Sequence, residues 1–88
     1  MARILVVDDE KSIQILLSEL LTRDSHEVKT AGSGGQACAM IEKEDFDLVI
    51  SDLHMARHSG IQVLEAAKKR DPLTEVLILT GHGSISSA

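Results

Sequence analysis

The sequence is poor in cysteine and in aromatic residues. Cys38 is the lone cysteine, so a disulfide within the chain is excluded, and a reducing cytoplasm is the expected location. Phe46 is the one aromatic residue, so the chain lacks a platform on which nucleic-acid bases could stack. The net charge of −5 and the lack of a basic stripe also argue against direct binding of nucleic acid.

Long apolar runs are missing as well. No stretch approaches the roughly 20 apolar residues that a membrane-spanning helix needs. The N-terminus has a single arginine before four aliphatic residues, which is unlike a secretory signal. We therefore expect no membrane partner. With 43% hydrophobic and 26% charged residues in a chain of 88, the composition is that of one small globular domain.

The sequence does contain short apolar runs that stop at side chains bearing oxygen. There are three such runs: 4–7 before Asp8 and Asp9, 46–52 ending at Asp52, and 75–80 ending at Thr80. The first of these, a continuous aliphatic run that stops abruptly, indicates a strand that is buried on both faces. The carboxyl ends of parallel strands meet at one edge of a sheet, where open α/β sheets place their ligand sites.

Helical periodicity follows the first strand. Residues 12–23 carry an apolar stripe that predicts a helix, with Asp9 or Glu10 as its N-terminal cap. The stripe consists of Ile13, Leu16, Leu17, Leu20 and Leu21, and Ile15 widens it. Residues 27–30 alternate between polar and apolar side chains and predict a short strand at or near a sheet edge.

Residues 31–35 include three glycines and predict a loop. A phosphate-cradling loop is the functional alternative, but the Lys-Ser/Thr ending of a P-loop and the G-x-G-x-x-G spacing are both missing. Two more helices are predicted. The first covers 36–44, with Ala37, Met40 and Ile41 inward and Cys38 packing at the flank; the second covers 60–70, with Ile61, Val63, Leu64 and Ala67 inward, and stops at Asp71-Pro72.

Strands that alternate with helices predict an α/β fold, with a parallel sheet, right-handed crossovers and helices on both faces. The expected architecture is a doubly wound, flavodoxin-like sheet with strand order 2-1-3-4. This order places the first and third strands side by side, about 4.8 Å apart. Asp8, Asp9 and Asp52 are thereby predicted to share one pocket.

Three close carboxylates repel one another, and a divalent cation relieves that repulsion. Ligands that are all oxygen favour Mg²⁺ over Zn²⁺. One of the carboxylates could then act as a nucleophile toward phosphate, with the Thr80 hydroxyl as a hydrogen-bond donor. In the simpler alternatives, Asp8 and Asp9 are a helix cap and a solvated acid, and Thr80 caps the next helix or bonds its own backbone.

The motifs resemble those of the receiver domain of bacterial two-component response regulators. The resemblance rests on Val-Val-Asp-Asp-Glu at 6–10, on Asp52 followed by Leu-His-Met-Ala-Arg-His-Ser-Gly, and on Leu-Ile-Leu-Thr-Gly at 77–81. It extends in register through all four strands. It implies a signalling module that accepts a phosphoryl group from a sensor histidine kinase with Mg²⁺. Such a module is not an enzyme beyond its own phosphorylation and dephosphorylation.

The resemblance assigns roles by position. Asp52 resembles the phosphoacceptor, which also ligates the metal. Asp9 resembles the direct metal ligand, Asp8 the acid that acts through water, and the backbone carbonyl of His54 the third protein ligand. Thr80 resembles the switch hydroxyl. The stretch 80–84, Thr-Gly-His-Gly-Ser, also resembles receivers attached to sigma-54-activating ATPases.

The chain departs from the family pattern in two respects. Ala56 stands where the family usually has proline. The fifth strand, its lysine and switch aromatic, and the last helix of the family are not represented, so residues 1–88 are expected to form an incomplete receiver domain. The edge of the fourth strand and one sheet face would then be bare, and self-association through either is expected.

The sequence also allows two other functions to be considered for this chain. A phosphorylation-impaired oligomerisation or interaction scaffold derived from a receiver is the main alternative. A small phosphohydrolase is disfavoured, because no general acid is placed near the nucleophile. Among other polar residues, His54, His58 and His82 could form a zinc or phosphohistidine site but are by default exposed loop residues. His26 has no predicted chemistry, and Lys68-Lys69-Arg70 is predicted to be a solvated helix end.

Overall fold

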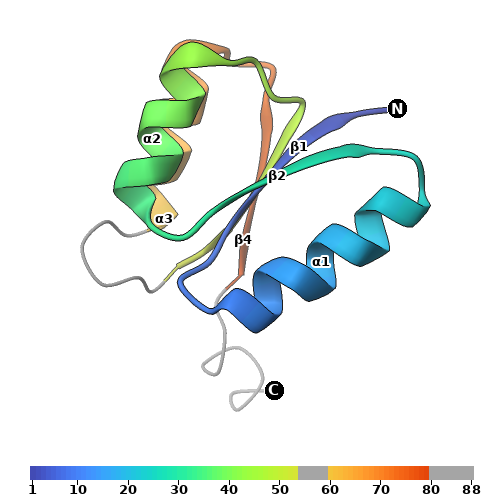
Figure 1. Cartoon of the computed structure of the whole chain (residues 1–88). Helices are drawn as coiled ribbons and strands as arrows, with labels where there is room; N and C mark the ends of the chain where they lie inside the picture. Colours follow the sequence, from blue (N-terminus) through green and yellow to red (C-terminus); the bar gives the residue numbers. More distant parts are fainter. Residues whose placement is uncertain (54–59, 80–88) are drawn as a thin grey trace, which may run out of the picture.

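The structure is a computed structural model and describes residues 1–53 and 60–79. The elements in this part of the chain are β1 (Arg3–Val7), α1 (Lys11–Arg23), β2 (Glu27–Ala31), α2 (Gly34–Lys43), β3 (Leu48–Asp52), α3 (Gly60–Arg70) and β4 (Glu75–Leu79). The four strands are parallel and lie in the order β2-β1-β3-β4 (Figure 1). The predicted α/β class and strand order are both confirmed.

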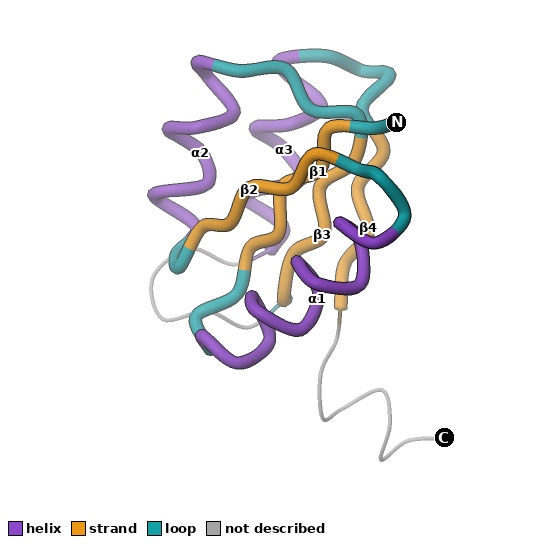
Figure 2. The backbone as a smooth tube through the Cα atoms, turned by 45° about the vertical axis from the view of Figure 1, so that its right-hand side comes forward, coloured by secondary structure: helices purple, strands orange, loops and turns teal. Residues whose placement is uncertain are grey.

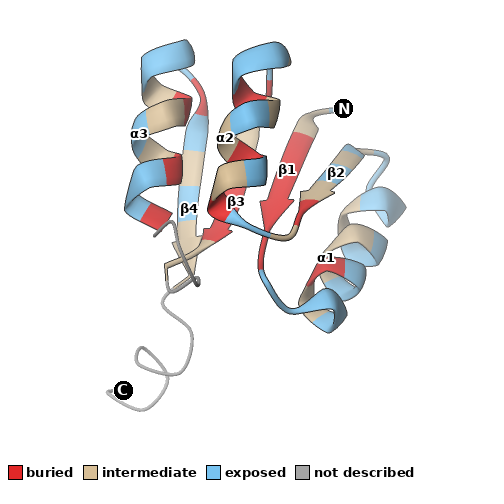
Figure 3. Ribbon diagram, turned by 60° about the vertical axis from the view of Figure 1, so that its left-hand side comes forward, coloured by how far each residue is buried: buried red, intermediate tan, exposed pale blue. Residues whose placement is uncertain are grey.

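The sheet lies between two layers of helix. Helices α2 and α3 cover one face and α1 covers the other (Figures 1 and 2). Alternate residues of β1 therefore enter two separate cores: Leu5 and Val7 pack on the α2–α3 side, and Ile4 and Val6 on the α1 side. Strand β1 is buried along most of its length (Figure 3), which explains why its sequence is continuously aliphatic rather than alternating.

Helix α1 is rotated relative to the sequence prediction. Leu17 and Leu21 pack toward the sheet as predicted, but Leu16 is 52% and Leu20 48% exposed. The buried residue of this helix is Gln14, which shares a face with Leu17 and Leu21 at spacings of three and seven residues. Because α1 is apolar over a wide arc, more than one face satisfied the periodic pattern. The predicted widening of the inward stripe by Ile15 is also wrong, since Ile15 is 49% exposed.

The start of α1 also differs from the prediction. Glu10 is the N-cap residue, but its side chain makes no capping hydrogen bond. The Asp8 carboxylate instead accepts a hydrogen bond from the Glu10 amide, with Oδ1 2.9 Å from the nitrogen. The Asp8 carboxylate thus stabilises the turn from β1 into α1, and no side chain caps the first turn of the helix at Glu10.

Helix α2 begins earlier than predicted. Ala31 completes β2, and Gly34 already belongs to the helix, so the predicted glycine loop is reduced to a short turn. Ser33 sets this start, because its Oγ accepts a hydrogen bond from the Gln36 amide at 3.1 Å. Gly34 is buried within the first turn of this helix, and the P-loop alternative is not supported.

Helix α3 has the predicted bounds but a different inner face. Val63 and Ala67 are fully buried, whereas Ile61 is 47% exposed, so its predicted inward position is wrong. The helix ends at Arg70, as the Asp71-Pro72 pair predicted. Its basic end is not merely solvated. Lys68 donates to the Thr74 carbonyl at 2.6 Å, and so ties the helix end to the start of β4.

The end of the sheet opposite its carboxyl edge is held by ion pairs. The Arg3 guanidinium contacts Glu27 at 2.6 Å and Glu44 at 2.8 Å, and Lys29 reaches the same Glu44 oxygen at 2.7 Å. These contacts tie β1 to β2 and to the end of α2.

Candidate functional site

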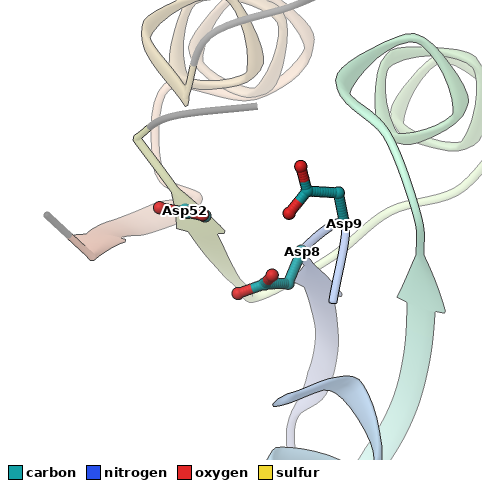
Figure 4. Close-up of side chains that lie close together, drawn as sticks. All are labelled: Asp8, Asp9 and Asp52. Atoms are coloured by element: carbon teal, nitrogen blue, oxygen red, sulfur yellow. The ribbon is translucent and has the colours of Figure 1, made fainter. Parts of the chain in front are cut away.

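Three carboxylates meet at the carboxyl edge of β1 and β3. Asp8 and Asp9 follow β1 directly, and Asp52 is the last residue of β3. One oxygen from each carboxylate lies within 4.8 Å of the other two. Figure 4 shows Asp8 and Asp9 reaching from the end of β1 toward Asp52. The parallel pairing of Val7 with Ser51 brings the two strand ends level, so the predicted convergence of these three side chains is confirmed.

Asp8 is the buried member of the cluster, with 6% of its surface exposed. Burial raises the pKa of its carboxyl group, and the neighbouring charges of Asp52, Asp9 and Glu10 raise it further, while the hydrogen bond from the Glu10 amide opposes the increase. The ionised form of Asp8 is therefore stabilised by one amide but lies among like charges. A bound cation would relieve that repulsion.

Asp9 is exposed and Asp52 is half-buried, so the cluster is open to solvent on one side. The backbone of Asp52 is confined by Gly60, the first residue of α3. A Cβ atom at Gly60 would lie 2.7 Å from the Asp52 carbonyl oxygen and 3.0 Å from the Leu53 Cα, closer than real Cβ atoms approach backbone. Only glycine lets α3 start this close to the end of β3.

Two residues that shape this site were not identified from the sequence. Gln14 donates a hydrogen bond from Nε2 to the Asp8 carbonyl oxygen at 2.7 Å, and Gly60 permits the close approach to Asp52. The available signals were a polar residue at helical spacing from Leu17 and Leu21, and a glycine at the start of a predicted helix. Neither signal specifies a partner, since the partners lie on other elements.

Several predicted site residues lie outside residues 1–53 and 60–79. These are His54, Ala56, His58, Thr80 and His82. The metal-ligand role of the His54 carbonyl and the switch role of the Thr80 hydroxyl therefore stay predictions. So does the alternative zinc or phosphohistidine site.

The structure shows the surroundings of His26 and Cys38, two other residues noted in the sequence. His26 Nδ1 accepts a hydrogen bond from the Ala2 amide at 3.0 Å, next to the start of β2. Cys38 is half-buried, and burial, with a smaller contribution from Glu42, raises the pKa of its thiol. A raised pKa lowers the thiolate fraction, which suits a packing residue rather than a reactive one.

The donor atoms of the cluster are all carboxylate oxygens. Such donors suit hard divalent cations, and Mg²⁺ in particular is bound through one or two carboxylates with several retained waters. The exposure of Asp9 leaves room for such waters on the open side of the cluster. The residues present therefore fit Mg²⁺ better than Zn²⁺, for which nitrogen or sulfur donors would be expected.

Replacing Asp8 by asparagine is expected to stabilise the metal-free chain. Above the raised pKa of Asp8 the folded state carries an ionised carboxylate among like charges, and asparagine removes that charge while keeping the oxygen that accepts from Glu10. We expect the free energy of unfolding at neutral pH to rise, because the charge that is removed is buried and lies among like charges. Urea denaturation followed by circular dichroism, with a chelator present, measures this change.

The pH dependence gives the control for that experiment. The pKa of Asp8 is higher in the folded chain, so the folded state binds more protons than the unfolded state between the two pKa values, and stability falls as pH rises through that window. The difference between Asp8→Asn and wild type should therefore vanish at pH below the ordinary pKa of an aspartate. A variant that is less stable than wild type at neutral pH would contradict the assignment of repulsion to Asp8.

A sequence model of the response regulator receiver domain matches residues 4–88. The chain belongs to this family. Receiver domains are phosphoacceptor signalling modules of two-component systems rather than conventional enzymes, and that is the function class of this chain. The resemblance seen in the sequence motifs is thus confirmed.

Within residues 1–53 and 60–79, no helix is both long and apolar enough to cross a membrane.

Individual relatives agree with this membership. The chain is 41% identical over 87 residues to the transcriptional regulatory protein GlrR of Escherichia coli K12, covering 99% of this chain but 20% of that protein. It is 35% identical over 83 residues to sporulation initiation phosphotransferase F of Bacillus subtilis, covering 94% of this chain and 67% of that protein. The chain thus spans about one fifth of the length of GlrR and of the transcriptional regulatory protein QseF of Escherichia coli O157:H7.

A solved structure gives the same fold. The response regulator TrrA of Thermotoga maritima, determined in complex with Mg(2+)-BeF, superimposes with a TM-score of 0.87 at 37% identity. The match covers 99% of this receiver and 76% of the TrrA chain.

Proposed function

We propose that this receiver accepts a phosphoryl group on the carboxylate of Asp52. The observation that carries the proposal is the cluster of Asp8, Asp9 and Asp52, whose oxygens lie within 4.8 Å of one another at the carboxyl edge of a receiver sheet. Asp52 fits the role of nucleophile, because it ends β3 on the open side of the cluster and is half-buried. Asp9, Asp52, the His54 carbonyl and, through water, Asp8 would hold Mg²⁺.

The reaction transfers a phosphoryl group from an oxygen or nitrogen atom of the donor to a carboxylate oxygen of Asp52. An Asp52 oxygen attacks the phosphorus of the donor, the bond from phosphorus to the donor's leaving group breaks, and the leaving group departs with the electron pair. The product on the protein is an acyl phosphate. Mg²⁺, when bound, supplies positive charge that offsets the charge of the phosphoryl oxygens. The Thr80 hydroxyl is proposed to donate a hydrogen bond to the new phosphoryl group.

The proposed donor is a sensor histidine kinase, whose phosphohistidine would dock against the carboxyl edge of the sheet, and the proposed location is the cytoplasm. The relative from Bacillus subtilis is named a phosphotransferase, which supports transfer chemistry at this edge. We propose that the chain's own chemistry is limited to the formation and hydrolysis of the acyl phosphate.

Incubation with acetyl phosphate and Mg²⁺ tests this proposal without the kinase. Intact-mass spectrometry is expected to show one added phosphoryl group, which is lost on hydrolysis and does not form when a chelator removes Mg²⁺. A chain that gains no phosphoryl group from acetyl phosphate or from any other small phosphodonor would contradict the proposed function and leave the family membership intact.

A self-associating scaffold is the second candidate, and the exposed apolar side chains favour it. Leu16 and Leu20 of α1 are about half exposed, and so is Leu77 of β4, at 51%. Leu77 pairs with Ile50 in the sheet register and therefore lies on the sheet face that α1 packs against. In the described part of the chain, β4 pairs with β3 alone, so its other edge presents open backbone groups.

Replacing Leu77 by glutamine is therefore expected to weaken association of the 88-residue chain with a second copy. Sedimentation velocity at micromolar concentration should show wild type as dimers or larger species and Leu77→Gln shifted toward monomer by roughly tenfold in dissociation constant, because burial of one leucine contributes about 1.5–3 kcal/mol. Ile61→Gln is the control, since Ile61 is similarly exposed but lies on α3, on the other side of the sheet. A monomeric wild type would contradict the scaffold candidate.

A further inference from the structure

We propose that Gln14 is a positioning residue that sets the geometry of the two metal-binding acids at the end of β1. The proposal rests on the proposed function, since it concerns how this receiver holds Mg²⁺. Gln14 touches neither Asp carboxylate. It acts through the backbone, because its side-chain Nε2 donates to the carbonyl oxygen of Asp8 at 2.7 Å.

This hydrogen bond fixes the peptide that joins Asp8 to Asp9. The carbonyl of Asp8 and the amide of Asp9 belong to one planar unit, so the direction of the carbonyl determines where the Asp9 Cα lies. The amide of Asp8 is held separately by the Ala31 carbonyl at 3.1 Å. Gln14 thus holds one of the two peptide groups that flank Asp9, and the Asp8 carboxylate holds the other through the Glu10 amide.

In residues 1–53 and 60–79, no hydrogen bond holds the Asp9 side chain. Its side chain is exposed, so packing does not fix its position, whereas Asp8 is buried and its Oδ1 accepts from the Glu10 amide. Mg²⁺ demands near-octahedral geometry. Ligands must therefore be held within about 0.5 Å of the binding geometry by the groups behind them. Behind Asp9 the structure provides the side-chain amide of Gln14 on the preceding peptide, in addition to the Asp8 carboxylate on the following one.

Gln14 is itself well anchored. Its side chain is 7% exposed and lies on the sheet-facing side of α1. The backbone amide of Gln14 donates a hydrogen bond to the Glu10 carbonyl at 3.2 Å. Gly32 lies beside it, since a Cβ at Gly32 would be 3.6 Å from Gln14 Nε2. Little solvent reaches the bond to Asp8, so water does not compete for the carbonyl and the bond holds its direction.

A purely structural role for Gln14 gives a different expectation. If the side chain only satisfies a buried carbonyl, its loss lowers the stability of the fold but leaves Mg²⁺ affinity unchanged in the molecules that remain folded. If it positions Asp9, Mg²⁺ affinity falls in the folded molecules. Mg²⁺ affinity therefore separates the two roles, and stability does not.

The test compares Gln14→Met with Gln36→Met. Methionine keeps the shape and length of glutamine but cannot donate a hydrogen bond. Gln36 is the matched control, because its Oε1 accepts from the Gly32 amide at 2.9 Å, on an exposed turn with no contact to Asp8. Isothermal titration with MgCl₂ on the folded proteins is expected to show about tenfold weaker binding for Gln14→Met, at the lower end of the effect of residues that orient metal ligands. Gln36→Met should match wild type.

A second variant covers the case in which Gln14→Met does not fold. Gln14→Leu also lacks a donor, and a leucine on this sheet-facing side of α1 can pack beside Leu17 and Leu21. We expect Mg²⁺ binding about tenfold weaker than in wild type, as for Gln14→Met, because the donor is lost. Mg²⁺ affinity equal to or tighter than wild type in the folded Gln14 variants would overturn the proposal and leave the proposed function standing. A wild-type chain that binds no Mg²⁺ would overturn both.

Discussion

Replacing Asp52 by asparagine is expected to abolish the phosphorylated form of this receiver. Asparagine is nearly isosteric, so β3 and the backbone contact with Gly60 should be preserved, but its amide cannot serve as the nucleophile. Removal of the group that forms the covalent intermediate lowers the rate of such reactions by at least about a thousandfold. With acetyl phosphate and Mg²⁺, intact-mass spectrometry should show no added phosphoryl group on Asp52→Asn.

Asp24→Asn is the matched control for this experiment. Asp24 is exposed at the C-terminal end of α1, away from the carboxyl edge of the sheet, so the same chemical change there should leave phosphorylation unchanged. Peptide mapping of the wild-type product should place the phosphoryl group on Asp52. An adduct that persists at the wild-type level in Asp52→Asn would reassign the acceptor, with Asp9 as the next carboxylate of the cluster to replace.

Replacing Gly60 by alanine is expected to damage fold and site together. The added methyl group would lie 2.7 Å from the Asp52 carbonyl oxygen, and the obstacle is backbone, which cannot turn away as a flexible side chain would. Either α3 or the end of β3 must shift. Overpacking of this kind typically costs about 1–3 kcal/mol. We expect a loss of that size in urea denaturation, and about tenfold weaker Mg²⁺ binding, because any shift of β3 moves the Asp52 carboxylate.

Gly32→Ala provides the comparison. A Cβ at Gly32 would meet only the side chains of Gln14 and Gln36, at 3.6 and 3.7 Å, which is ordinary van der Waals contact. The same substitution should therefore change stability by less than about 0.5 kcal/mol, as for surface positions without special contacts. If Gly60→Ala were equally mild, the close approach of α3 to Asp52 would not be a constraint on the site.

Substitutions of the carboxylates and substitutions of the groups behind them are expected to have different effects on stability, because only the carboxylates are charged. The carboxylates that would bind the cation repel one another in its absence, so removing a charge at Asp8 should stabilise the metal-free chain and weaken the site. The groups that hold the carboxylates in place, Gln14 and Gly60, carry no charge. Changes there should lower Mg²⁺ affinity without any gain in stability. Such a trade between stability and function is common where like charges are held together for a ligand.

Local sequence patterns were sufficient to predict the parallel sheet and the convergence of Asp8, Asp9 and Asp52. Continuous aliphatic runs can be buried only between two layers, and their alternation with helices leaves a parallel sheet as the consistent arrangement. The positions of Asp8, Asp9 and Asp52 at the ends of such runs then place them at one edge. Asp71-Pro72 fixed the end of α3, because proline disfavours helix in the residue before it.

The inward face of each helix, and the groups that lie behind the three carboxylates, depend on contacts between elements that are distant in the sequence. Helix α1 offers apolar residues around much of its circumference, so periodicity could not choose between the face with Leu16 and Leu20 and the face with Gln14. The sheet made that choice, because α1 must lie against β1 and β2 with its N-terminus next to Asp8. The contacts of Gln14 with Asp8 and of Gly60 with Asp52 join residues on different elements, and local sequence patterns contain no information about such distances.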